Sequence, residues 1–158
     1  MIDFICKFIK SLLNEKKMTN KESLMMFFQS VLGTPYKWGG NNCLQGYDCS
    51  GFVQDALAVI GVDPKGDQTS NDLYNYFKDI QELNPKNISF GCLLFFGKEK
   101  VTHVAIALNN KQMIEAGGGG SKTTTFQDAM KINACVRIRP INRRSDLLHV
   151  IKIKEFDE

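Results

Sequence analysis

The sequence predicts an α+β fold, in which helices from the first half of the chain pack on a mainly antiparallel sheet of about five to six strands. Up to about residue 78 the apolar residues recur at helical spacing, whereas from residue 90 they form a continuous run and then alternate. Asn109-Asn110-Lys111 separates two strand-like segments, as expected of a hairpin turn.

Length and composition favour one domain without a metal or cofactor. The chain has 158 residues, of which 43% are hydrophobic, and its net charge of +3 is too small to indicate a nucleic-acid partner. The spacing of its five cysteines fits neither a zinc site nor a disulfide framework, so we expect reduced thiols. The two histidines, His103 and His149, lie far apart in the sequence, and no zinc site is expected.

Residues 1–20 are predicted to form an amphipathic N-terminal appendage, followed by one main domain over residues 21–158. Ile5, Phe8, Ile9 and Leu12 recur at helical spacing among several lysines. The segment is too short to span a membrane and lacks the apolar core and cleavage site of a secretory signal. Two interpretations stay open: a helix that packs on the domain or on a partner protein, and a helix that lies on a membrane surface. We expect the first.

Three further helices are expected, with a loop between the first two. The first begins at Thr19 or Asn20 and ends before the loop 33–48; its apolar set is Leu24, Met25, Phe27, Phe28 and Val31. The second starts at Cys49 after the N-cap residue Asp48 and stops at Gly61. The third runs from Gln68 to Lys78 and is capped by Thr69 or Ser70.

The strands are predicted from the change of period. Residues 92–96 fit a buried strand, and residues 101–108 alternate, with Val101, His103, Ala105 and Ala107 on one face. Residues 112–116 return antiparallel, and residues 135–139 and 147–154 form two closing strands. Gly117 to Gly120 is interpreted as a mobile rim loop, and His149 as a structural or surface histidine.

Cys49 is the candidate nucleophile. A helix N-terminus favours an anion, and the thiolate is the reactive form of cysteine. By itself the residue is better explained as a small buried hydrophobic side chain, which is the commoner role of a free cysteine. A helix packed across the sheet would bring His103 near it as a base, and Glu115 would orient the imidazole. His103 and Glu115 lie directly opposite each other only if the hairpin loop has an odd length or contains a bulge.

The loop 33–48 contains Tyr36 and Trp38. These aromatic side chains are either the wall of a substrate groove or packing residues of a turn-rich connector.

Several ordered motifs resemble the NlpC-type cell-wall cysteine peptidases, which are papain-like enzymes. The resemblance covers roughly residues 23 to 140. Its motifs are Gly33-Thr-Pro-Tyr-Lys-Trp-Gly-Gly40, Tyr47-Asp-Cys-Ser-Gly-Phe-Val53, Gly91-Cys-Leu-Leu-Phe-Phe96, Thr102-His-Val-Ala-Ile-Ala-Leu108 and Met113-Ile-Glu-Ala116. It implies a papain-like NlpC-type fold and cleavage of peptidoglycan stem peptides, at the bond from D-glutamate to a diamino acid.

The resemblance also implies roles for single residues. Cys49 matches the nucleophile and His103 the general base. Tyr36 matches a tyrosine whose hydroxyl faces the active site and assists the oxyanion. Asp48 and Ser50 match residues that bind the free amine of the stem peptide.

Two positions depart from the family pattern. Glu115 stands where the family usually has His, or sometimes Asn or Gln, and a carboxylate there is expected to raise the pKa of His103. Cys92 replaces a common Asp, for which we expect an altered turn and retained activity.

The lack of an export signal and of wall-binding repeats leads us to expect a bacteriophage protein, made in the cytoplasm and acting at the bacterial cell wall. It would be an endolysin or a virion-carried enzyme, with the N-terminal helix docking on a virion or another partner. Two alternatives stay open: an inactive or structural virion module with a peptide-binding groove, and a phage protease or amidase that acts on another amide. Glu115 on the wrong face of the sheet would favour the inactive module.

Overall fold

The computed structural model describes residues 18–157, so the amphipathic pattern of residues 1–17 lies outside the described residues. Within the described part of the chain, no helix combines the length and the apolar character needed to cross a membrane.

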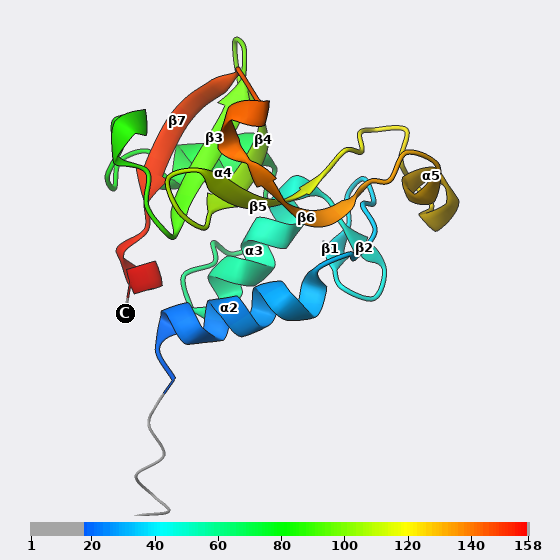
Figure 1. The fold of residues 1–158 in the computed structure, drawn as a ribbon, viewed down its shortest axis with the longest axis horizontal. Coiled ribbons are helices and arrows are strands. Elements are labelled where there is room, and N and C mark those ends of the chain that lie inside the picture. The colour runs from blue at the N-terminus through cyan, green and yellow to red at the C-terminus, as the bar shows by residue number, and fades with distance from the viewer. Residues whose placement is uncertain (1–17, 158) are drawn as a thin grey trace, which may run out of the picture.

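Helices and an antiparallel sheet form two layers, as Figure 1 shows. The sheet has the order β6-β5-β4-β3-β7, and every neighbouring pair is antiparallel. Its strands are β3 (Cys92–Gly97), β4 (Val101–Ala107), β5 (Gln112–Gly117), β6 (Cys135–Pro140) and β7 (Leu147–Lys152). The helices are α2 (Asn20–Val31), α3 (Cys49–Val59), α4 (Ser70–Phe77) and α5 (Phe126–Lys131). The predicted α+β class with a five-stranded antiparallel sheet is confirmed.

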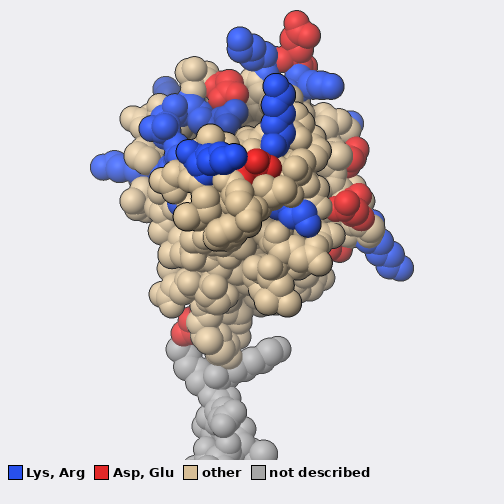
Figure 2. Space-filling model, turned by 90° about the vertical axis from the view of Figure 1, so that its right-hand side faces the viewer, with Lys and Arg blue, Asp and Glu red and all other residues tan. Residues whose placement is uncertain are grey.

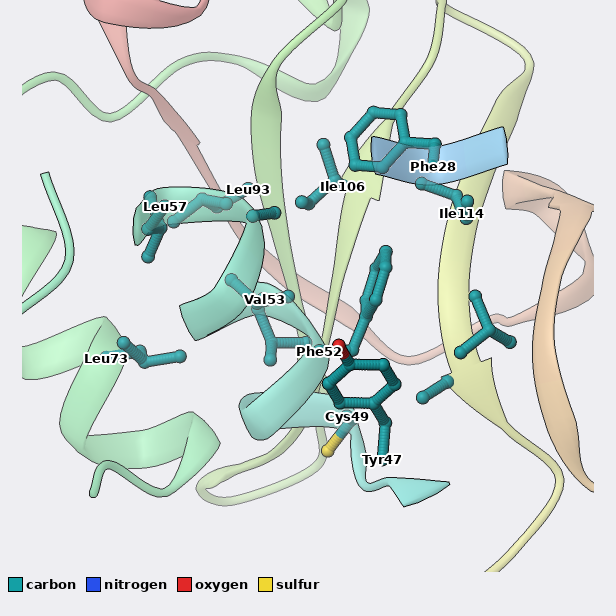
Figure 3. Packing of buried hydrophobic residues seen from close by; sticks show 14 of the residues in the cluster. Phe28, Tyr47, Cys49, Phe52, Val53, Leu57, Leu73, Leu93, Ile106 and Ile114 are labelled. Carbon is teal, nitrogen blue, oxygen red and sulfur yellow. The ribbon is translucent and has the colours of Figure 1, made fainter. Parts of the chain in front are cut away.

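Helix α3 lies between α2 and the sheet and carries the centre of the core. Phe52, Val53 and Leu57 are completely buried on it, which follows from their common stripe at helical spacing. Figure 3 shows these side chains among apolar residues of the strands, such as Leu93 and Ile106. In the same view the sulfur of Cys49, the first residue of α3, points away from these side chains.

Side-chain caps fix the N-terminal ends of two helices close to the predicted positions. Thr19 and Glu22 form a capping box at the start of α2, and Thr69 and Asp72 form one at α4. The expectation that Met25 belongs to the buried stripe of α2 is wrong, because its side chain is 39% exposed.

A β-bulge in β4 corrects the predicted alternation. Phe96 pairs with His103, but the next residue of β3, Gly97, pairs with Val101, which leaves Thr102 as the extra residue. Val101 is therefore buried in the same cluster as Val104, on the face opposite to the one predicted for it. Period-2 reasoning fails at such a point because one inserted residue exchanges the two faces.

Three smaller features also differ from the predictions. The loop 33–48 contains a short hairpin of β1 (Asn41–Asn42) and β2 (Gly46–Tyr47). Helix α5 follows the glycine-rich segment, where no helix was predicted. Strand β7 ends at Lys152 rather than at residue 154.

Candidate active site

All seven predicted site residues line one cavity of about 530 Å³. They are Tyr36, Trp38, Asp48, Cys49, Ser50, His103 and Glu115. The first five come from the loop 33–48 and the start of α3, and the other two come from strands β4 and β5. The cavity therefore opens where the N-terminus of α3 meets the sheet.

Cys49 is the first residue of α3, and Asp48 is its N-cap. The Oδ1 atom of Asp48 accepts hydrogen bonds from the Gly51 amide (2.9 Å) and the Ser50 hydroxyl (3.0 Å), and its Oδ2 accepts one from the Gly39 amide (3.0 Å). A Cβ atom on Gly51 would lie 2.2 Å from the carbonyl oxygen of Gly40, so only glycine allows this close contact. These contacts fix the helix end from which Cys49 projects.

His103 joins Cys49 to Glu115. Its Nε2 atom lies 2.6 Å from Glu115 Oε2, and its imidazole also hydrogen-bonds the side chain of Cys49. Because Nε2 is engaged by the carboxylate, Nδ1 is the ring nitrogen that faces the thiol. The three side chains thus form the connected sequence of nucleophile, imidazole and orienting acid that thiol catalysis requires.

His103 and Glu115 share a face of the sheet without lying directly opposite each other. Ile106 pairs with Ile114 and Ala107 with Met113. Continued along the strands, this register places Glu115 opposite Ala105, so its side chain reaches diagonally to His103.

The electrostatics favour a protonated imidazole. Burial lowers the pKa of His103, but the hydrogen bonds and charges of Cys49 and Glu115 outweigh burial and raise it to about 9. For Glu115, burial raises the pKa, whereas His103, Arg139 and Arg144 together lower it below its ordinary value. A carboxylate and an imidazolium therefore face each other in a site where both side chains are mostly buried.

Tyr36 and Trp38 form part of the wall. Tyr36 is buried, and burial, followed by the charges of Cys49 and Asp48, raises its pKa above the ordinary value. Its hydroxyl consequently stays protonated at neutral pH and can donate a hydrogen bond. Trp38 is 54% exposed, so its indole is available to a ligand. Gly119 packs against Tyr36, since a Cβ atom there would lie 2.1 Å from the ring.

Three arginines of the cavity, Arg139, Arg143 and Arg144, were missed by sequence reasoning. The Nε atom of Arg139 lies 3.6 Å from Glu115 Oε1. Arg144 binds Asp146 through two nitrogens, at 3.0 and 2.6 Å, and stacks on the Phe96 ring at 4.8 Å. A signal was present in the sequence, because all four arginines of the chain lie within residues 137–144.

Comparison with known proteins identifies the family. The chain matches the NlpC/P60 family over residues 33–139, which include Cys49, His103 and Glu115. The protein belongs to the NlpC/P60 family. The motif resemblance seen in the sequence is thereby confirmed.

Two curated NlpC/P60 relatives illustrate the match. The peptidoglycan endopeptidase RipB of Mycobacterium tuberculosis is 36% identical over 108 residues, which are 60% of this chain and 42% of the relative. The bifunctional muramidase/DL-endopeptidase CwlT of Bacillus subtilis is 30% identical over 130 residues, which are 75% of this chain and 37% of the relative. The chain thus spans about two fifths of the length of these relatives.

Solved structures agree on the NlpC/P60 fold. The structure of RipB has a TM-score of 0.64 at 30% identity, with 85% of this chain and 64% of that chain covered. RipD of M. tuberculosis, described as a non-catalytic NlpC/p60 domain protein adapted to peptidoglycan binding, has the same TM-score at 23% identity and covers 86% of this chain and 98% of that chain. The fold alone therefore does not separate catalysis from binding.

Two departures from the NlpC-type pattern have local explanations. Cys92 begins β3 directly after Gly91, which has a φ angle of +77°, and its sulfur accepts a hydrogen bond from the Ser89 amide at 3.5 Å. Sulfur thus serves as an acceptor in this turn. Glu115 lies on the same face of the sheet as His103, which removes the condition that would have favoured an inactive module.

The remaining titratable candidates lie outside the cavity. The Nδ1 atom of His149 lies 2.7 Å from Glu82 Oε1, and its ring stacks on Tyr74 at 4.2 Å. This environment is that of a structural histidine. Within the part of the chain that the structure describes, the cysteines are free thiols, and Cys43 is exposed.

Proposed function

We propose that the protein is a cysteine endopeptidase that cleaves a peptide bond in peptidoglycan stem peptides. The observation that carries the proposal is the hydrogen-bonded sequence Cys49–His103–Glu115, with the thiol at a helix N-terminus and all three side chains lining one cavity. The names of RipB and CwlT, both endopeptidases, support the substrate class.

In the proposed reaction the Cys49 sulfur attacks the carbonyl carbon of the scissile amide. Protonated His103 donates its Nδ1 proton to the leaving amine, the C–N bond breaks, and a thioester remains on Cys49. Neutral His103 then takes a proton from water, the resulting hydroxide attacks the thioester, and the carboxylic acid product leaves as the thiolate–imidazolium pair is restored.

The transition states carry negative charge on the former carbonyl oxygen. The backbone N–H of Cys49 is one donor for this oxyanion, because the first amides of a helix have no partner within the helix. The protonated hydroxyl of Tyr36, on the cavity wall next to Cys49, is the proposed second donor.

Glu115 is proposed to take the third catalytic position, which orients the histidine and is usually occupied in the family by a neutral His, Asn or Gln. Its carboxylate accepts the Nε2 proton of His103, which fixes the ring and directs Nδ1 to the thiol. Unlike a neutral side chain, it also stabilises the imidazolium, so the reactive ion pair is expected to persist to higher pH.

The proposed scissile bond joins D-glutamate to a diamino acid. The free amine of the stem peptide would bind near Asp48 and Ser50. The Asp48 carboxylate already accepts three hydrogen bonds from the protein, which hold it in one orientation, and two oxygens offer about four acceptor positions in all. One position therefore remains for an ammonium group.

The predicted bacteriophage origin, action at the cell wall and docking through residues 1–20 stay predictions. So does the alternative of a phage protease or amidase that acts on another amide.

Digestion of purified peptidoglycan tests the proposal. Wild-type protein and Cys49→Ala are incubated with peptidoglycan and, separately, with a free stem peptide that carries the amine, and the soluble products are identified by mass spectrometry. We expect the wild type to release a fragment ending in D-glutamate and Cys49→Ala to release none. Wall binding by the wild type without any cleavage would contradict the proposal and favour the binding module.

A further inference from the structure

The arginines of this chain are concentrated at the cavity. All four lie within residues 137–144, whereas lysines are spread along the chain. Three of the four arginines line the cavity, and none of the lysines described by the structure does so. Figure 2 shows basic side chains gathered over the upper part of one face. Lysine and arginine carry the same charge, so charge alone does not explain why arginines and not lysines line the cavity. The property that only arginine has is its planar guanidinium group, which binds carboxylates through two parallel hydrogen bonds.

The three cavity arginines differ in how far the protein already engages them. Arg144 is held by both oxygens of Asp146, and Arg139 lies beside Glu115 at the longer distance of 3.6 Å. Arg143 is exposed and forms no ion pair with any carboxylate of residues 18–157. The cavity therefore contains the guanidinium of Arg143, which has no acidic partner among the described residues, and that of Arg139, whose contact with Glu115 is long.

The fourth arginine shapes the same rim. The Nη2 atom of Arg137 donates a hydrogen bond to the carbonyl of Gly117 at 2.8 Å. Gly118 has a φ angle of +88°, and a Cβ atom there would lie 2.2 Å from this nitrogen. Arg137 thus fixes the glycine segment that borders the cavity. Arg137 itself does not line the cavity, whereas Arg139 and Arg143 do.

We propose that Arg139 and Arg143 form a subsite for a free carboxylate of the substrate, close to the scissile bond. This inference rests on the proposed function and narrows its substrate class. A D-glutamyl residue has two carboxyl groups, of which one forms the scissile amide and the other remains free. The subsite selects peptides in which this second group is ionised over peptides in which it is an amide.

The test compares two synthetic peptides, Ala-D-Glu-Lys with the second glutamyl carboxylate free and the same peptide with that group as a carboxamide. Their binding is measured by calorimetry on Cys49→Ala protein, which prevents turnover. We expect the carboxylate peptide to bind about tenfold more tightly, the lower end of the range for hydrogen bonds to charged groups, because Arg143 is exposed. Arg143→Gln is expected to bring the ratio close to one, and Arg143→Lys to give an intermediate ratio.

The matched control is Lys111→Gln, which removes the same charge from an exposed residue outside the cavity and should leave the ratio unchanged. Equal binding of the two peptides, no measurable binding of the carboxylate peptide, or a ratio unaffected by Arg143→Gln overturns the subsite. Cleavage by wild-type protein is measured separately. If the carboxylate peptide binds more tightly in an Arg143-dependent way but neither peptide is cleaved, the subsite is supported and the endopeptidase is contradicted. If both peptides bind equally and both are cleaved, the endopeptidase is supported and the subsite is contradicted.

Discussion

Replacing Glu115 by glutamine keeps a hydrogen-bond acceptor beside His103 and removes a negative charge. The carboxylate lies 2.6 Å from Nε2, and the side chains of His103 and Glu115 are only 12% and 6% exposed, so solvent screens the pair weakly. Hydrogen bonds to charged groups contribute about 1.5–3 kcal/mol. Because one pKa unit corresponds to about 1.4 kcal/mol, the pKa of His103 should fall by about one to two units in Glu115→Gln.

The sign of the effect on activity follows from the ion pair. The reactive state needs protonated His103, so activity is lost as pH rises through the pKa of His103, which is about 9 in the wild type. In Glu115→Gln the alkaline limit of kcat/KM should move to lower pH by the same one to two units. The measurement is the pH dependence of kcat/KM for a synthetic stem peptide between pH 5 and 10.

Glu82→Gln is the matched control. It removes the charge from the other carboxylate–histidine contact among residues 18–157, at 2.7 Å from His149 and outside the cavity. Its pH profile should match that of the wild type. An alkaline limit that stays in place in Glu115→Gln, or moves equally in Glu82→Gln, would refute the assigned role of Glu115. Circular dichroism establishes that both variants are folded.

Variants at three other positions test two residues of the site and one packing contact of the fold. Asp48→Ala should lower the free energy of unfolding by about 1 kcal/mol or more through loss of the α3 cap, whereas Asp48→Asn should keep most of the stability but raise KM; equal KM values for Asp48→Asn and wild type would exclude the amine-binding role. Tyr36→Phe should lower kcat about 10- to 100-fold with an unchanged melting temperature, and an unchanged kcat would remove its hydroxyl from the oxyanion site. Gly91→Ala should destabilise the fold, since its φ angle is +77° and a new Cβ would lie 2.3 Å from Phe156; urea denaturation with a midpoint equal to that of the wild type would contradict this packing.

The helical half of the fold was predictable because its signals are local. Asp48 marked the start of α3, and Gly61, with a φ angle of +75°, marked its end. For α4 the sequence left Thr69 and Ser70 open as the cap, and the structure uses Thr69. On this side of the cavity, the roles of Tyr36, Asp48 and Ser50 were assigned from short motifs that resemble the NlpC-type peptidases. Each of these features depends on a few consecutive residues, which is why the sequence shows them.

The sheet side was less predictable because its geometry depends on pairing between strands. The bulge at Thr102 reverses the face of Val101 without any change in the residue pattern that signals it. The diagonal contact of Glu115 with His103 follows from a register that the hairpin sequence does not specify. The sequence therefore identified both residues but not how they meet.

The arginines were missed for a different reason. Arg139 belongs to β6, and Arg143 and Arg144 belong to or follow the short 3₁₀ helix Ile141–Arg143, about 25 to 40 residues beyond His103 and Glu115 in the chain. The pairing of β6 with β5 brings Arg139 to Glu115, and the 3₁₀ helix after β6 leads to Arg143 and Arg144 at the same cavity. Their clustering in the sequence was visible, but composition alone does not show which cavity a cluster faces.

The role of Cys49 as nucleophile is tested most directly by the initial rate at which a synthetic stem peptide is cleaved by wild type, Cys49→Ala and Cys43→Ala. Cys43 is an exposed thiol outside the cavity and serves as the control. We expect equal rates for wild type and Cys43→Ala and a rate at least about 10³-fold lower for Cys49→Ala. Comparable rates for Cys49→Ala and wild type would contradict the assignment of Cys49 as the nucleophile.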